Sequence, residues 1–428
     1  MPKPLKCGSR RTERERYRAR RWCWQRLGLA LAAAVGCVGD GWRPRASRID
    51  AAVEDGSEVG CEAGQGCGAP SCVGTALRAL SASPVAHTCA IRCDGGVWCW
   101  GSNERGQLGD GTLTTQRSPV QVLGLGGPAT SLSTGYNHSC AVVGQGVRCW
   151  GENTYGGLGD GTRTDRPTPV TAVGLGGVPV LVAAGGLHTC ALVEGGDLWC
   201  WGRNEHGGIG DGTLLDRLQP ARIELEGPMV SVVAGQYHTC VRSEAGRVWC
   251  WGSNVFGAVG DGGTQDRVSP RPVTLPAPAL MLSTRSNTTC ALLEGGQVWC
   301  WGFNAEGGVG DRGRTNRHRP VRVLDLEATA DVAAGERHSC AVSGGGTARC
   351  WGSNARGQLG DGTQQNQPSP TEVLDPGGLA AVVVAGGAHS CVALRDGGAR
   401  CWGADDRGQL GDGGNEDQRA PVEVRLPP

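Results

Sequence analysis

The chain has 428 residues, with 41 basic and 41 acidic side chains and therefore no formal net charge at pH 7. The lack of a basic excess argues against general nucleic-acid binding. Its 74 glycines, against two phenylalanines and four tyrosines, favour turns over a helix-packed core, and its 21 cysteines are typical of an oxidising compartment rather than of a cytosolic enzyme.

Residues 1–42 have the composition of an export segment. An arginine-rich start is followed by the apolar run LGLALAAAVGC, which ends at Cys37 and is shorter than the roughly 20 residues of a membrane-spanning helix. Its last residues, Ala34 to Cys37, are similar to a bacterial lipobox, which predicts lipidation of Cys37. The hypothesis is an exported protein, at the cell envelope or surface or in the medium, which touches a membrane only through this anchor.

Residues 43–76 form a polar, glycine-rich spacer that carries Cys61, Cys67 and Cys72. With Cys93 these cysteines make an even set of four. This predicts that the spacer is stapled onto the first repeat, and leaves the pairing open.

Residues 77–428 repeat seven times with a period near 50. The dipeptide Cys-Trp marks the period at residues 99–100, 149–150, 200–201, 250–251, 300–301, 350–351 and 401–402. Such periods are typical of propellers and solenoids. In the third repeat, glycine and proline clusters separate four expected strands at residues 180–183, 188–193, 197–202 and 221–225. The sequence predicts an all-β, seven-bladed β-propeller of four-stranded antiparallel blades, because a solenoid would leave two uncapped sheet ends.

Two elements of the repeat resemble those of the regulator of chromosome condensation repeat family. They are Gly185-Gly186-Leu187-His188-Thr189 and the N-x-x-G-Q-L-G-x-G-T pattern of residues 103–112 and 354–363. The resemblance covers about residues 77–426 and implies a propeller. It also implies two functions: secreted members that inhibit β-lactamases bind a protein through a loop face, and the eponymous member is a guanine-nucleotide exchange factor. One departure is the Cys after His-Ser/Thr in every repeat, where the family has an aliphatic residue.

The cysteines of each repeat lie nine or ten residues apart. If the second and third strands form a hairpin, this spacing places them opposite each other across a two- or three-residue turn, within reach of a disulfide. The predicted disulfides are Cys89 with Cys99, Cys140 with Cys149, Cys190 with Cys200, Cys240 with Cys250, Cys290 with Cys300, Cys340 with Cys350, and Cys391 with Cys401.

A metal site of His188 with its two cysteines is disfavoured, because the fifth repeat keeps both cysteines with Thr288 in place of the histidine. Strand alternation then sets Trp98 and Trp100 beside Ala90 on the face opposite the cysteines. These tryptophans are interpreted as blade-to-blade core.

Other repeated polar residues are interpreted as parts of the fold. We expect each Gly-Asp carboxylate to cap its own turn, and each repeat histidine to hydrogen-bond a neighbouring loop. The aspartates are Asp110, Asp160, Asp211, Asp261, Asp311, Asp361 and Asp412; a near-ring of arginines follows at Arg117, Arg166, Arg217, Arg267, Arg317 and Arg419. No catalytic motif appears, so the sequence predicts no enzyme activity, no cofactor and no metal.

The positions that break the repeat are the candidate partner site. The loops between the first and second strands and between the third and fourth strands leave a blade on one side, and they hold most of the few Tyr and Phe rings. The candidate residues are Tyr136, Tyr155, Leu187, His206, Tyr237 and Phe256. Clustered aromatic side chains are typical of binding hot spots, although isolated surface rings remain an alternative. The hypothesis is a monomeric, non-enzymatic propeller that binds a protein or surface polysaccharide and no nucleic acid; the alternative is an exchange-factor-like regulator.

Overall fold

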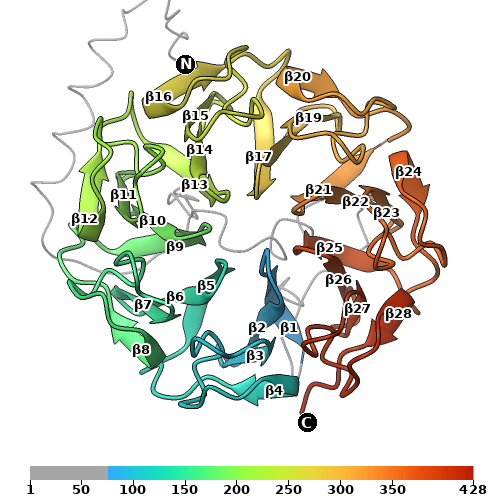
Figure 1. Cartoon of the computed structure of the whole chain (residues 1–428), viewed down its shortest axis with the longest axis horizontal. Helices are drawn as coiled ribbons and strands as arrows, with labels where there is room; N and C mark the ends of the chain where they lie inside the picture. The colour runs from blue at the N-terminus through green and yellow to red at the C-terminus, as the bar shows by residue number, and fades with distance from the viewer. Residues whose placement is uncertain (1–75, 327, 428) are drawn as a thin grey trace, which may run out of the picture. The chain divides into compact units, whose positions relative to one another are not determined.

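The computed structural model describes residues 76–326 and 328–427, and in them 28 β-strands form seven four-stranded antiparallel sheets (Figure 1). Cys37, Cys61, Cys67, Cys72 and the predicted export segment lie outside the described residues. Each sheet is one blade, built from four strands that are consecutive in the chain. The predicted seven-bladed propeller is confirmed.

The strands are named in chain order. Blades 1 and 2 hold β1 Leu77–Ala82, β2 His87–Arg92, β3 Val97–Gly101, β4 Gln116–Gln121, β5 Ala129–Thr134, β6 His138–Val143, β7 Gly146–Gly151 and β8 Arg166–Thr171. Blades 3 and 4 hold β9 Pro179–Ala184, β10 His188–Val193, β11 Leu198–Gly202, β12 Arg217–Ile223, β13 Met229–Ala234, β14 His238–Ser243, β15 Val248–Gly252 and β16 Arg267–Val273. Blades 5 to 7 hold β17 Ala279–Arg285, β18 Thr288–Leu293, β19 Val298–Gly302, β20 Arg317–Arg322, β21 Thr329–Ala334, β22 His338–Ser343, β23 Ala348–Gly352, β24 Gln367–Glu372, β25 Ala380–Ala385, β26 His389–Leu394, β27 Ala399–Gly403 and β28 Gln418–Glu423.

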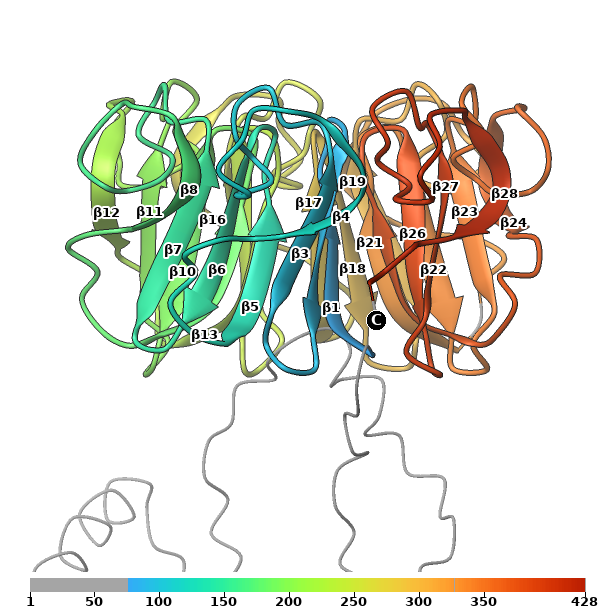
Figure 2. The same cartoon turned by 90° about the horizontal axis from the view of Figure 1, so that it is seen from below.

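The first strand of each blade lies at the centre of the ring and the fourth at its rim (Figures 1 and 2). Blade 7 packs directly on blade 1, where Leu77 N donates to Gly397 O. The ring therefore closes without exchange of a strand between blades in the described chain. The outer strand begins earlier than predicted: in blade 3 it starts at Arg217 rather than at residue 221. Pro220 is tolerated inside it because an edge strand has one unpaired side.

The predicted hairpins and disulfides are confirmed. In blade 3, Cys190 pairs with Cys200 in register across β10 and β11. All seven predicted pairs are disulfide-bonded, with Cα atoms 4.0–4.1 Å apart. In blade order the bridges join Cys89 to Cys99, Cys140 to Cys149, Cys190 to Cys200, Cys240 to Cys250, Cys290 to Cys300, Cys340 to Cys350, and Cys391 to Cys401.

Cys93 is also disulfide-bonded. None of the fourteen cysteines of the seven bridges is its partner. The candidates that the sequence offers, Cys61, Cys67 and Cys72, lie outside the described residues.

The core lies between blades, where the disulfide face of one packs on the tryptophan face of the next. Between blades 3 and 4, Cys190 and Cys200 lie in one cluster with Trp249 and Trp251. The Trp after the second Cys is fully buried in every blade. The Trp before it is less regular than predicted. Trp98, Trp199 and Trp299 are half-buried, and Arg148, Arg349 and Arg400 take this position in blades 2, 6 and 7.

One backbone carbonyl connects each pair of neighbouring blades. At the interface of blades 3 and 4, Gly208 O accepts from Trp251 Nε1 at 2.9 Å and from Thr239 Oγ1 at 2.8 Å. His188 Nε2 of blade 3 lies 2.9 Å from the same hydroxyl. The carbonyl bonds recur at all seven interfaces, with Gln107, Gly157, Gly208, Ala258, Gly308, Gln358 and Gln409 as acceptors. The histidine's partner is thus a hydroxyl on a neighbouring strand, not a loop as predicted.

This arrangement determines the state of the histidines. Because the hydroxyl donates its only proton to the carbonyl, it can only accept from the imidazole, which must carry its proton on Nε2. Six repeat histidines are buried: His87, His138, His188, His238, His338 and His389. Burial lowers the pKa of His188 to about 3 and that of His138 to about 4, so both are neutral.

The loop between the third and fourth strands is held by the repeat asparagine. Asn204 Oδ1 accepts from Ile209 N at 3.0 Å, and its Nδ2 donates to Asp211 Oδ1 at 3.3 Å. Asp211 Oδ1 also accepts from Thr213 N, which confirms that the aspartate caps its own turn. The arginine near-ring was partly wrong. Arg166, Arg217, Arg267 and Arg317 pair with their own blade's aspartate, but the equivalent residues in blades 1, 6 and 7 are Gln116, Gln367 and Gln418, so Arg117 and Arg419 are not members.

Blade 7 replaces the asparagine with a carboxylate. Asp405 Oδ1 accepts from Leu410 N at 2.9 Å, as the asparagine does elsewhere, so Oδ2 takes the place of the amide nitrogen that faces the aspartate. Asp405 is fully buried, and its Oδ2 has no hydrogen-bond partner among the described residues. Burial, together with the adjacent Asp412 carboxylate, raises the pKa of Asp405 to about 7. A proton on Asp405 replaces the missing amide hydrogen.

The buried histidines predict acid lability. The pKa of these histidines in the folded protein lies below the ordinary value of about 6.5. The folded state therefore keeps its full stability above that pH and loses stability as the pH falls towards about 4, because the unfolded chain then binds more protons. Unfolding at about pH 5.5 should take up about five protons through the six imidazoles, measured from the slope of the free energy of unfolding against pH. His338→Gln should lower the uptake by about one. An uptake near zero would contradict a neutral histidine set.

Asp405 predicts a loss of stability at the other end of the pH scale. Its folded-state pKa lies above the ordinary value of about 3.9, so the stabilising proton is fully bound below about pH 4 and is lost as pH rises through about 7. Asp405→Asn restores an amide donor, so it should raise the melting temperature at about pH 8 and change it little at about pH 5. The matched control Asn354→Asp should introduce the same pH dependence in blade 6. If neither variant changed the dependence of the melting temperature on pH, the proposed proton on Asp405 would be refuted.

Candidate functional site

One side of the ring, which we call the loop face, is formed by two kinds of loop. These connect the first strand to the second and the third to the fourth in each blade (Figure 2). Tyr237 comes from the first kind and His206 from the second, and their ring centroids lie 5.0 Å apart. The prediction that both kinds emerge on the same side is confirmed.

The centre of the candidate site is Arg203, which the sequence analysis did not single out. Its guanidinium carbon lies 4.4 Å from the ring centroid of Tyr155 and 5.4 Å from that of Tyr237. Its Nη2 donates to Glu205 Oε2 at 2.5 Å. We call Tyr155, Arg203, Glu205, His206 and Tyr237 the Arg203 cluster; it joins blades 2, 3 and 4.

A signal for Arg203 was present in the sequence. The residue before the repeat asparagine varies from blade to blade: Ser102, Glu152, Arg203, Ser253, Phe303, Ser353 and Ala404. The same variable position supplies Phe303, which packs edge-on against Phe256 with centroids 5.2 Å apart. Phe256 thus belongs to a second group, which includes Arg337 over the Phe303 ring at 5.7 Å.

The remaining predicted residues, Tyr136 and Leu187, both come from loops between the first and second strands. Tyr136 hydrogen-bonds Ser286, and burial raises the pKa of its hydroxyl well above the usual value. Leu187 is half-exposed, and its carbonyl accepts from Arg203 N at 3.0 Å, which helps to position that arginine. All six predicted residues are partly exposed: Tyr155, His206 and Tyr237 lie in the Arg203 cluster, Leu187 adjoins it through Arg203, and Phe256 belongs to the second group.

Some variable loop positions also connect blades. His206 Nδ1 lies 2.8 Å from Asp266 Oδ2 of blade 4, while Asp266 Oδ1 accepts from Asn254 N. Arg105 of blade 1 and Asp165 of blade 2 make the equivalent contact at 3.4 Å. His206 therefore has a structural contact in addition to any contact with a partner.

Exposed apolar side chains lie in the loops between the third and fourth strands of blades 3 and 4. Leu214 and Leu215 are 55% and 66% exposed, and Val255 is 58% exposed. Leu215 precedes Asp216, which pairs with Arg163 of blade 2 at 3.4 Å, so this loop lies over the boundary of blades 2 and 3. The loop face of blades 2 to 4 thus combines rings, an arginine and exposed aliphatic side chains.

Arg285 of blade 5 crosses the centre of the ring. Its Nη1 donates to Thr134 O of blade 2 at 2.8 Å. Blades 2, 3, 4, 6 and 7 have glycine here, next to the histidine: a Cβ at Gly135 would be 2.4 Å from His138 Cε1. Blade 5 carries Thr288 instead of the histidine, which makes room for a side chain at residue 285.

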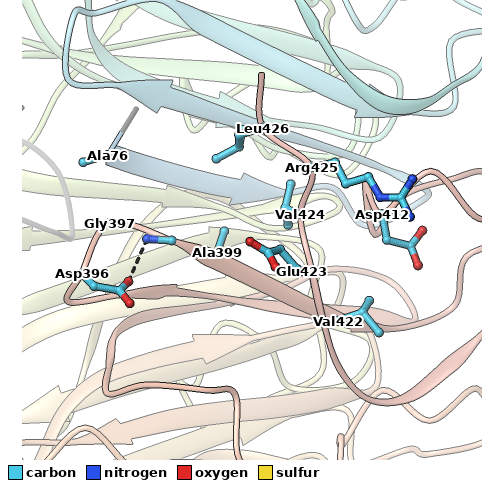
Figure 3. Close-up of a pocket in the computed structure, with 11 residues that line it drawn as sticks. Ala76, Asp396, Gly397, Ala399, Asp412, Val422, Glu423, Val424, Arg425 and Leu426 are labelled. Atoms are coloured by element: carbon cyan, nitrogen blue, oxygen red, sulfur yellow. Dashed lines mark hydrogen bonds between the residues drawn. The ribbon is translucent and has the colours of Figure 1, made fainter. Parts of the chain in front are cut away.

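A cavity of about 910 Å³ lies where blade 7 meets blade 1 (Figure 3). Its charged lining residues are Asp396, Asp412, Glu423 and Arg425. Among the described residues, its lining contains no Ser, Thr, Cys, His or Lys side chain, and therefore no hydroxyl, thiol or amine nucleophile.

Residues 76–326 and 328–427 contain no group of three or more His, Cys, Asp or Glu side chains placed to hold a metal ion. They also contain no helix long and apolar enough to cross a membrane.

Solved structures with the same fold share little sequence with the chain. Human WBSCR16 is 20% identical with a TM-score of 0.70, over 78% of this chain and 94% of that one. Prp20p of Saccharomyces cerevisiae is 22% identical with a TM-score of 0.70, over 81% of this chain and 87% of that one. At these identities the likeness shows the fold alone.

Sequence comparison places the repeats in a family. The E3 ubiquitin-protein ligase HERC2 of Homo sapiens is 43% identical over 56 residues, which are 13% of this chain and 1% of HERC2. The model of the regulator of chromosome condensation (RCC1) repeat matches residues 381–409, and that of the RCC1-like domain matches residues 78–373. Since the latter match covers most of the chain, the protein belongs to the RCC1-like domain family.

Proposed function

We propose that the protein is an exported, non-enzymatic binding propeller whose loop face over blades 2 to 4 recognises a protein partner. The Arg203 cluster is the observation that carries this proposal. It places two tyrosines, an arginine and a histidine from three blades on one surface. Tyr and Arg are enriched in binding hot spots, because they bury apolar surface and also donate hydrogen bonds.

The surroundings of the cluster favour a protein over a glycan. Leu214, Leu215 and Val255 are each more than half exposed beside the cluster. Burial of such aliphatic side chains against another protein is favourable, at about 25 cal/mol per Å² of apolar surface removed from water. A surface polysaccharide remains the second candidate for this site.

An exchange-factor-like role has less support. It rests on the fold shared with Prp20p, whose solved structure is described with its binding properties to Gsp1p and histones. Seven disulfides fit an oxidising compartment, where no cytosolic GTPase is present.

The Arg203 cluster predicts a hot spot that can be mapped by substitution. Crosslinking of the full-length protein to envelope and exported fractions should capture a partner, and Tyr155→Ala or Arg203→Ala should weaken its binding by about 2 kcal/mol or more. Leu215→Ala should weaken binding too. The matched control is Leu379→Ala, a 54% exposed leucine in the link between β24 and β25, on the other side of the ring. Equal losses for Leu215 and Leu379 would place the partner site elsewhere.

Export predicts the oxidation state of the cysteines. Protein recovered from the exported fraction should gain alkylation at the fourteen propeller cysteines only after reduction, as read by intact mass. Cys37→Ser should release the protein from the membrane fraction if Cys37 carries the anchor. Free thiols at most propeller positions in the native protein would argue against an oxidising compartment.

A further inference from the structure

Blade 5 departs from the repeat by gaining arginines along its outer edge. Arg319 lies in β20, where the other six blades have Ser118, Thr168, Gln219, Ser269, Ser369 and Ala420. Arg314 and Arg322 occupy positions that are basic in only one other blade each. Those two other arginines are neutralised: Arg163 pairs with Asp216 and Arg222 pairs with Asp197.

The neighbouring edge of blade 4 gains a charge as well. Arg271 lies in β16, where the equivalent residues are Val120, Val170, Ala221, Val321, Thr371 and Val422. The strands β16 and β20 are neighbours on the rim (Figure 1). We call Arg271, Arg314, Arg319 and Arg322 the arginine strip.

Three members of the strip, Arg271, Arg319 and Arg322, border the boundary between blades 4 and 5. Arg271 pairs with Cys250 across the sheet, so it shares the disulfide face of blade 4. Arg322 pairs with Trp299, so it shares the tryptophan face of blade 5, and Trp299 packs on the blade 4 core. Arg319 reaches across this boundary, because a Cβ at Gly262 of blade 4 would lie 2.5 Å from its Nη2.

Among the described residues, the strip has no carboxylate partner. Asp311 pairs with Arg317, Asp325 pairs with Arg312, and Glu306 accepts a hydrogen bond from Asn366. All four arginines of the strip have no carboxylate within ion-pair distance among these residues, and Arg271, Arg314, Arg319 and Arg322 are each exposed. Like charges gathered without acids repel one another, so an anionic ligand would relieve a cost that the folded protein carries.

Backbone strain gathers in the same part of the ring. The non-glycine residues with positive φ in the described chain are Ser286, Arg312, Asp325 and Ala328, at 40°, 63°, 60° and 44°. All four lie in blade 5 or in the link that follows it. Arg312 stands where the other blades have Gly111, Gly161, Gly212, Gly262, Gly362 and Gly413. Strain of this kind is concentrated at functional segments of proteins.

We propose that the arginine strip binds an acidic polysaccharide through its sulfate or carboxylate groups. Guanidinium groups bind such planar or tetrahedral oxyanions with paired hydrogen bonds, and an extended polymer can meet the arginines in succession along the rim. A nucleic acid is less suitable. The seven disulfides indicate an oxidising compartment, and no Tyr or Phe lies within β16 or β20 to stack a base. The strip is separate from the Arg203 cluster, so this proposal does not depend on the proposed function.

The test compares two variants with the same change of charge. Full-length protein with Arg314, Arg319 and Arg322 each replaced by Ala is set against protein with Arg395, Arg419 and Arg425, exposed arginines of blade 7, replaced by Ala. The probes are heparin oligosaccharide and polygalacturonate, with binding measured at low and at raised salt. We expect the blade 5 variant to lose roughly tenfold or more in affinity for at least one glycan and to show a shallower salt dependence, because fewer counterions are released on binding.

The outcomes separate the alternatives. The blade 7 variant should bind within about twofold of the unchanged protein, and equal melting temperatures should show that both variants are folded. Equal losses in both variants would reduce the effect to net charge and overturn the proposal. Failure of both glycans to bind the unchanged protein would also overturn it, and tighter binding of duplex DNA than of heparin at the same salt would reassign the strip to nucleic acid.

Discussion

The propeller depends on one backbone carbonyl per blade, which accepts hydrogen bonds from two side chains of the next blade. At the interface of blades 3 and 4 the donors are Trp251 and Thr239. Both donors are fully buried, so an unpaired indole N–H or hydroxyl would be costly there. The indole also packs in the hydrophobic cluster between the two blades. A single side chain thus provides both the packing and the alignment of two blades, which explains why the Cys-Trp dipeptide is present in all seven repeats.

The disulfide and the histidine complete this arrangement within and between blades. The disulfide joins two strands that already pair in register, so it closes a short loop and adds less stability than a long-range bridge would. The histidine of one blade donates a hydrogen bond to the Ser/Thr hydroxyl of the next blade, the same hydroxyl that bonds the carbonyl. Burial keeps the imidazole neutral. Blade 5 lacks it, since Thr288 instead donates to Phe303 O of its own blade. The boundary of blades 5 and 6 therefore lacks the histidine contact but keeps the carbonyl bonds, and Arg285 adds a contact across the ring to blade 2.

Structural and binding roles are divided among different residues of the same loops. Asn204 and Asp211 hold the loop of blade 3 together, while Arg203 and Glu205, on either side of the asparagine, lie on its surface. Because the repeated residues such as Asn204 and Asp211 hold the loop together, the variable residues can differ from blade to blade without loss of the fold. This separation allows one ring to carry two distinct surfaces, the Arg203 cluster on the loop face and the arginine strip on the rim.

The sequence by itself determined every feature that depends on spacing along one chain segment. The 50-residue period determined the number of blades, the nine- or ten-residue spacing of the cysteines determined the hairpin register and the disulfides, and strand parity determined which loops share a face. The tertiary structure decided which residues of different blades meet. Arg203 between Tyr155 and Tyr237, Phe303 against Phe256, and Arg285 at Thr134 join positions of different blades that are far apart in the sequence. These contacts follow from the curvature of the ring and the direction of each side chain, and no local pattern encodes either.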